Sequence, residues 1–220
     1  MARFVLASIT WLLLGMHFAI GAPIVVHNTG VDSSDSLVDA GEQTAFWTLL
    51  SAPTGATETL GSNPFRYFNT AYAADSSTSA WVSMAADGNA SAGGVYVYQL
   101  LVDLTGLDPS SAVITGQFGT DNDGFIRVNA GPNEATQGFG GFATLTSFTL
   151  DSGFVAGMNS IEVGVNNGGN PTALRVQFSS ATADALNGTG VPEPASLLLI
   201  AVALAGLGFS RRVKYVRSAF

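Results

Sequence analysis

The central part of the chain alternates short apolar runs with turn residues. Candidate strands lie at 24–27, 45–50, 65–67, 80–84, 95–104, 112–118, 124–129, 142–150, 160–166 and 173–179, with Gly, Asn, Asp, Ser and Pro between them. Many short strands separated by such turns are typical of two-layered antiparallel folds. No stretch of this part has a helical period. The pattern therefore predicts an all-β domain over residues 22–180, a jelly-roll-like antiparallel β-sandwich.

Two of these runs predict a hairpin. In 161–165 and 174–178, alternate positions are apolar, and residues 167–170 (Asn-Gly-Gly-Asn) lie between the runs. If those four residues form the loop, the apolar positions of both strands point inward, and Glu162 lies opposite Arg175 on the outer face. We expect an exposed cross-strand ion pair there, which contributes only ~0–1 kcal/mol to stability.

The first 21 residues have the pattern of a secretory signal peptide. Arg3 is the charged start, residues 4–20 form an apolar run, and small residues precede a cleavage site between Gly21 and Ala22. This order of charged start, apolar run and small residues is typical of an export signal. The apolar run is also long enough for an uncleaved membrane anchor, which is the alternative.

The last 30 residues, 191–220, form a segment with three parts. It begins with two prolines, continues with 15 residues that carry no charge (195–209), and ends in a basic cluster over 211–217. A helix of that length spans ~22 Å, somewhat less than the ~30 Å hydrocarbon core. Because the run is apolar on all sides and ends in basic residues, it predicts a single transmembrane helix with a cytoplasmic end rather than a core helix.

This ordering resembles the PEP-CTERM sorting signal. The residues that carry the resemblance are Val191, Pro192, Glu193, Pro194, Arg211 and Arg212. The resemblance implies an exported protein of a Gram-negative bacterium that makes extracellular polysaccharide. It also implies an exosortase, a membrane protease-transpeptidase that cuts near the Pro-Glu-Pro triplet after an inner-membrane intermediate. The protein would then reach the cell surface or the extracellular matrix, and residues 181–190 would be a flexible linker to the tail.

The body of the chain carries a second resemblance. The run 104–109 leading into 112–116, followed by 154–159 and 166–176, is similar to the β-sandwich often found in PEP-CTERM proteins and to galactose-binding-like jelly rolls. The shared features are turn residues and alternating apolar positions. They imply a fold and no particular ligand, because a fold does not determine a function.

Charge and composition restrict the partners of the body. Residues 22–190 hold three arginines, no lysine and fifteen acidic residues, which gives a net charge of −12, and the whole chain lacks cysteine. Such a surface repels nucleic acid and anionic lipid head groups, whereas neutral glycans and cations remain suitable partners. Without cysteine the fold has no disulfides, and thiolate chemistry is excluded.

One polar cluster suggests a binding site. Asp121, Asn122 and Asp123 lie between two predicted strands, and their oxygens suit Ca²⁺. An Asx-rich turn explains the same residues without a metal, and the sequence favours the turn. Further along the chain, the glycine-rich segment 137–142 carries Phe139 and Phe142, which either stack on a sugar ring or cap the edge of the sandwich.

The sequence predicts a protein that is not an enzyme and needs no cofactor. The body lacks cysteine and lysine and offers no Ser-His-Asp set. We expect an exported surface protein that associates with extracellular polysaccharide or a biofilm matrix. The alternatives are a glycan-acting periplasmic or surface hydrolase that uses two of the acids, and a binding module that stays tethered to the membrane.

Processing at both ends is directly testable. We predict that protein recovered from its host begins at Ala22, ends within residues 191–194 and is found outside the inner membrane. Intact mass spectrometry of separate cell fractions measures both ends. A membrane species that retains residues 211–220 would show that the tail is a permanent anchor, and one that retains residues 1–21 would show an uncleaved N-terminal anchor.

Overall fold

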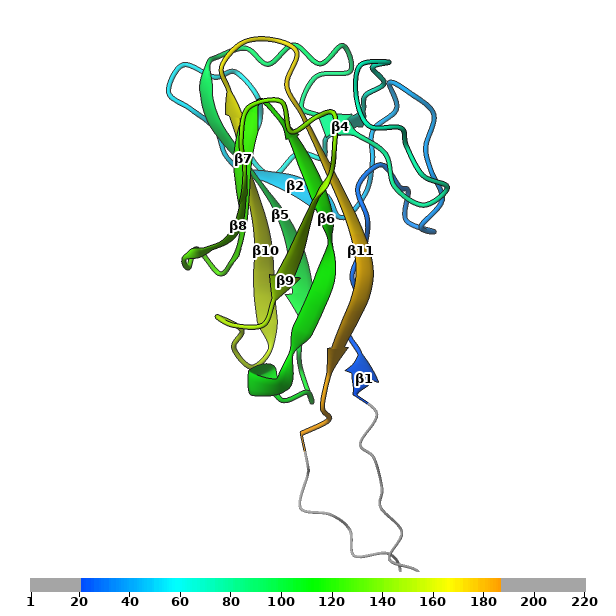
Figure 1. Ribbon diagram of the computed structural model, residues 1–220, viewed down its shortest axis with the longest axis vertical. Helices are drawn as coiled ribbons and strands as arrows, with labels where there is room; N and C mark the ends of the chain where they lie inside the picture. The colour runs from blue at the N-terminus through cyan, green and yellow to red at the C-terminus, as the bar shows by residue number, and fades with distance from the viewer. Residues whose placement is uncertain (1–20, 187–220) are drawn as a thin grey trace, which may run out of the picture. The chain divides into compact units, whose positions relative to one another are not determined.

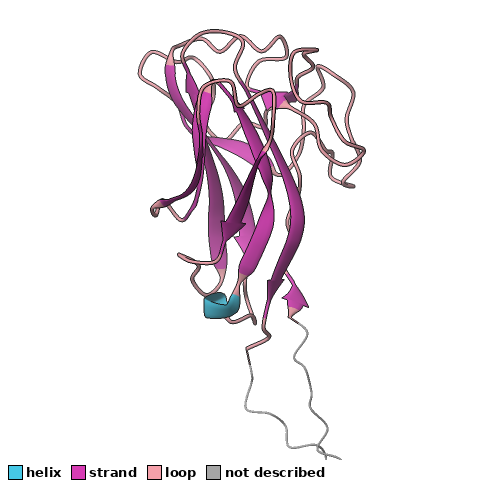
Figure 2. Cartoon of the chain, in the orientation of Figure 1, coloured by secondary structure: helices cyan, strands magenta, loops and turns pink. Residues whose placement is uncertain are grey.

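The computed structural model describes residues 21–186 (Figure 1). All but the last residue of the signal peptide predicted at 1–21 lie outside the described residues, and so does the whole segment predicted at 191–220. Within them the structure is all-β, with two antiparallel sheets and a single helical turn, η1 (Pro109–Ser111; Figure 2). Between residues 21 and 186, no helix is long and apolar enough to cross a membrane.

The two sheets form the layers of a β-sandwich. The first has the order β3 (Phe65–Arg66), β4 (Val82–Ser83), β11 (Ala173–Ala183), β6 (Val113–Asp121), β9 (Thr146–Leu150), with β1 (Ala22–Pro23) paired to the end of β11. The second has the order β2 (Trp47–Ser51), β5 (Gly94–Asp103), β10 (Met158–Asn167), β7 (Asp123–Val128), β8 (Asn133–Gln137). The predicted all-β sandwich is therefore confirmed.

Period-two alternation places the core between the sheets, as the sequence predicts. On β10, Ile161, Val163 and Val165 are fully buried, and on β11 Leu174 and Val176 are fully buried as well. Burying each such side chain contributes ~1.5–3 kcal/mol, so the inner faces of these two strands account for much of the stability of the sandwich.

The predicted hairpin between residues 161–165 and 174–178 is wrong. β10 pairs with β5 and β7, whereas β11 pairs with β4 and β6 in the other sheet. The segment after β10 therefore crosses from one sheet to the other instead of turning back. The alternation that we used to align the two strands identifies the buried face of each strand, but any partner with the same alternation satisfies it.

Glu162 and Arg175 consequently have separate partners and are both buried. Glu162 is aligned with Arg127 of β7, whose Nε donates to its carboxylate at 2.8 Å. Arg175 lies opposite Gly119 of β6, and its guanidinium donates to the Ser79 hydroxyl and to the Ala74 carbonyl. Burial lowers the pKa of Arg175. The expected exposed ion pair therefore does not form. Glu162 and Arg175 are instead buried polar residues with separate partners, one on the outer side of each sheet.

Two other expectations change at the strand level. β11 continues to Ala183, so part of the predicted linker 181–190 belongs to the sandwich. The strand expected at 24–27 is replaced by β1 at Ala22–Pro23. β8 was missed because its sequence, Asn-Glu-Ala-Thr-Gln, is mostly polar, which is common for a strand at the edge of a sheet.

The outer faces of the two sheets differ. Tyr72 and Trp81 pack over the six-stranded sheet in a small second cluster with Ala173, flanked by Phe142 and Leu145. The outer face of the five-stranded sheet instead presents exposed apolar side chains on β5, with Val95 42% and Leu101 56% exposed. The five-stranded sheet is therefore the more accessible of the two.

Double-mutant cycles test the revised pairing of Glu162. We expect Glu162→Gln and Arg127→Met to be coupled by ~0.5–3 kcal/mol, because the two side chains share an ion pair. Glu162→Gln and Arg175→Met should be additive within ~0.5 kcal/mol, since the two residues lie on different sheets. Urea unfolding of the single and double variants measures both cycles. The reverse result, coupling only with Arg175, would restore the hairpin.

Candidate functional site

The structure separates the two carboxylates of the predicted calcium cluster. The chain leaves the six-stranded sheet at Asp121, the end of β6, and enters the five-stranded sheet at Asp123, the start of β7. Asp121 accepts a hydrogen bond from the Tyr72 hydroxyl on the outer side of one sheet. Asp123 accepts one from the Asn166 amide, 3.0 Å away, on the outer side of the other sheet.

Asn122 stabilises the crossover between them. Its side-chain oxygen accepts a hydrogen bond from the Gly168 amide at 2.7 Å, which connects it to the second crossover, the one that follows β10. The three side chains of the cluster therefore do not converge on one cation. Among residues 21–186, no three His, Cys, Asp or Glu side chains are grouped closely enough to hold a metal ion.

Asp121 is buried and hydrogen-bonded within the protein, so its carboxyl group has a structural role. It is 4% exposed, and burial raises its pKa, while the hydrogen bond from Tyr72 opposes that shift. Burial and the neighbouring carboxylate also raise the pKa of Tyr72, so its hydroxyl stays protonated and able to donate. This hydrogen bond connects the loop that contains Tyr72, which packs over the six-stranded sheet, to the end of β6.

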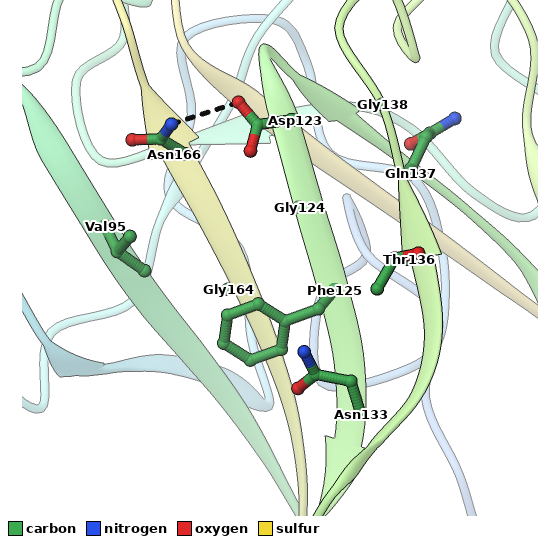
Figure 3. A pocket seen from close by; sticks show the side chains of 10 residues that line it. All are labelled: Val95, Asp123, Gly124, Phe125, Asn133, Thr136, Gln137, Gly138, Gly164 and Asn166. Carbon is green, nitrogen blue, oxygen red and sulfur yellow. Dashed lines mark hydrogen bonds between the residues drawn. The ribbon is translucent and has the colours of Figure 1, made fainter.

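A hollow that combines an aromatic ring with several polar groups lies on the outer face of the five-stranded sheet (Figure 3). It has a volume of about 420 Å³, within the range of roughly 300–1,000 Å³ that is usual for small-molecule sites. Strands β5, β10, β7 and β8 contribute its walls. The lining residues are Val95, Asp123, Gly124, Phe125, Asn133, Thr136, Gln137, Gly138, Gly164 and Asn166.

An aromatic ring forms the floor of this hollow. Phe125 of β7 is aligned with Gly164 of β10, and a Cβ atom on Gly164 would lie only 2.2 Å from the Phe125 ring. The ring therefore lies across the backbone of β10 because residue 164 has no side chain. The guanidinium of Arg127 lies over the ring, 5.1 Å from the ring centroid, which is a cation–π distance.

Polar groups surround the ring. The Asp123–Asn166 hydrogen bond engages one carboxylate oxygen and leaves the other one exposed to the hollow (Figure 3). Asn133 and Thr136 lie on β8, and both are exposed. Among the ten lining residues only Asp123 is charged. The site thus combines one aromatic surface with several hydrogen-bonding groups.

Two further hollows are less suited to a ligand. One, of about 240 Å³, contains Asp75, whose carboxylate already binds Arg66 and the Trp81 amide. The other, of about 450 Å³, contains Glu58, whose carboxylate accepts hydrogen bonds from Ser91 and Tyr96. In both, the acidic group is occupied by the protein itself.

The sequence offered Phe139 and Phe142 either for stacking on a sugar ring or for capping the edge of the sandwich. Phe139 is 84% exposed in the loop after β8, outside the lining of the hollow, and Phe142 packs against Tyr72 with ring centroids 5.3 Å apart. Phe125 and Gly164 were missed because they looked like ordinary strand residues. The available signal was a glycine at an outward position of an otherwise regular strand, which often marks a close approach.

Comparison with known proteins finds the PEP-CTERM protein-sorting motif at residues 190–212. The match confirms the predicted sorting signal, and its residues lie beyond the described part of the chain. The motif indicates an exported, surface-directed protein that is processed by an exosortase-type enzyme. No curated protein matches the chain.

Because the pKa of Asp121 is raised, we predict that wild type and Asp121→Asn differ in stability by an amount that depends on pH. The folded state holds the Asp121 proton more tightly than the unfolded state, so the carboxyl favours folding below its ordinary pKa of 3.8 and loses that contribution as the pH rises. We therefore expect Asp121→Asn to raise the melting temperature relative to wild type at pH 7 and to lose this advantage near pH 3. Scanning calorimetry at both values, with the exposed Asp151→Asn as control, measures it. An advantage that grows toward low pH would contradict the assignment.

Proposed function

We propose that this exosortase-processed surface protein is a non-enzymatic module that associates with extracellular polysaccharide. The observation that carries the proposal is the hollow on the five-stranded sheet, where an aromatic floor is combined with uncharged hydrogen-bonding groups around a single carboxylate. The PEP-CTERM motif supplies the location, because it directs the chain to the cell surface. The chain would pass through an inner-membrane intermediate of a Gram-negative bacterium, held by its C-terminal helix.

The charge of the body supports a glycan partner. With a net charge of −12 over residues 22–190, the protein repels nucleic acids and acidic membranes. Neutral polysaccharide chains experience no such repulsion. They also offer both apolar ring faces and hydroxyl groups, which are the two kinds of surface that the hollow can contact.

The placement of the acids favours binding over hydrolysis. Glycoside hydrolases of the usual kind need two carboxyl groups that flank the scissile bond, ~5–9.5 Å apart. Each of the three hollows described above is lined by one acidic residue, namely Asp123, Asp75 or Glu58. A hydrolytic role would need a pair of acids in one of them, so we propose a binding module.

Retention on polysaccharide tests the function. We expect the processed protein, purified from the culture of its host, to co-sediment with the host's own extracellular polysaccharide and to generate no new reducing ends. Heat-denatured protein is the control for non-specific trapping. Failure to co-sediment would exclude the matrix role, and a time-dependent increase in reducing ends that Asp123→Asn abolishes would favour the hydrolase.

A further inference from the structure

We infer that the hollow over Gly164 is a subsite for one uncharged hexose ring, with Phe125 as its stacking surface and the Asp123–Asn166 pair as its hydroxyl acceptor. This inference rests on the proposed polysaccharide association and specifies where and how it occurs. It assigns the ligand class to a site on the flank of one sheet, where β10 and β7 lie side by side (Figures 1 and 3).

The first argument is the preformed position of the Phe125 ring. A Cβ atom at position 164 would lie 2.2 Å from Cε1 and 2.3 Å from Cζ of the ring, so the bare glycine backbone is what allows the ring to lie there. The Arg127 guanidinium lies over the ring at 5.1 Å from its centroid, and it is itself held by an ion pair with Glu162. Because the ring is already ordered, a ligand that stacks on it loses little additional side-chain entropy.

The second argument is the chemistry of the ring face. The face of an aromatic ring is negative, and it attracts groups with a positive edge, including polarised C–H groups. One side of a hexopyranose ring presents such C–H groups, while its hydroxyls project from the rim. Stacking on Phe125 therefore directs the hydroxyls outward, toward the polar residues around the hollow.

The third argument is the position of those polar residues. Asn166 donates to one oxygen of Asp123 at 3.0 Å, which orients the carboxylate and leaves its second oxygen to accept from a ligand hydroxyl. Hydrogen bonds to an ionised acceptor are about twice as strong as neutral ones. On the opposite side of Phe125, Asn133 and Thr136 of β8 provide an amide and a hydroxyl that both donate and accept.

The fourth argument concerns charge selectivity. Asp123 is the single charged group among the lining residues, and the nearby Arg127 is neutralised by its ion pair with Glu162. A uronic acid would place its carboxylate against Asp123 and the acidic body, which is unfavourable. The site therefore selects neutral hexoses over uronic acids, and Asp123 is the residue that makes the selection.

Affinity electrophoresis tests this inference. The sample is the processed protein, recovered after the whole chain has been expressed in its host. The probes are a neutral glucan, a neutral galactomannan and polygalacturonate. We expect retardation by at least one neutral polymer and none by polygalacturonate. Phe125→Ala should weaken retardation about tenfold, which corresponds to about 1.4 kcal/mol. Gly164→Ala should weaken it as well, because the new Cβ displaces the ring.

Phe139→Ala is the matched control, because it removes an exposed phenylalanine of a nearby loop that does not line the hollow. This variant should bind like wild type. Asp123→Asn should weaken binding to the neutral polymer and reduce the discrimination against polygalacturonate. Thermal melts of all variants show whether a loss of binding comes from unfolding; Gly164→Ala and Asp123→Asn provide independent readouts if Phe125→Ala is unstable.

The outcomes separate the two proposals. Binding to the host polysaccharide that survives Phe125→Ala and Gly164→Ala in folded protein would overturn the subsite and leave the proposed function standing. Loss of binding in Phe139→Ala alone would show that the ligand stacks on Phe139 of the loop and not on Phe125. Preference for polygalacturonate would overturn the assignment of a neutral hexose. Absence of binding to the host polysaccharide and to all three probes would overturn the proposed function and the subsite together.

Discussion

The structure depends on the burial of two strand faces against each other. β10 is the middle strand of one sheet and β11 the middle of the path through the other, and their inward side chains are fully buried between the layers. Without disulfides, this apolar contact and its neighbours provide the stability of the domain. The crossovers at Asn122 and after Asn167 are joined by the Asn122–Gly168 hydrogen bond, which connects the two layers at one end.

On the outer side of each sheet an aromatic ring packs over a glycine, but one ring is covered and the other is accessible. Gly119 on β6 and Gly164 on β10 are outward positions without a side chain, and each lies beneath an aromatic ring, Trp81 and Phe125 respectively. The ring of Trp81 is itself covered, and the residue is only 2% exposed. Phe125 remains half-buried at the floor of an open hollow. One glycine therefore serves packing, whereas the other leaves an accessible aromatic surface.

The arrangement of the strands also places the ends of the described chain. β1 pairs with the last residues of β11, so the chain enters and leaves the sandwich side by side (Figure 1). The hollow lies on the flank of the five-stranded sheet, built by strands that do not include β1 or β11. The flank proposed for binding is thus separate from the two strands at which the described chain begins and ends.

Local patterns in the sequence determined the fold class, the buried face of each strand and the sorting motif. Alternation acts residue by residue, and the order of prolines, apolar run and arginines is continuous in the chain, so no tertiary information was needed. Strand partners were decided only by the tertiary structure, because alternation is degenerate with respect to the partner. This is why Glu162 is paired with Arg127 instead of Arg175. The site was also decided there, since Phe125, Gly164 and Asn166 meet only when β7 and β10 are aligned. For the same reason, two carboxylates that are two residues apart in sequence, Asp121 and Asp123, face opposite sides of the sandwich.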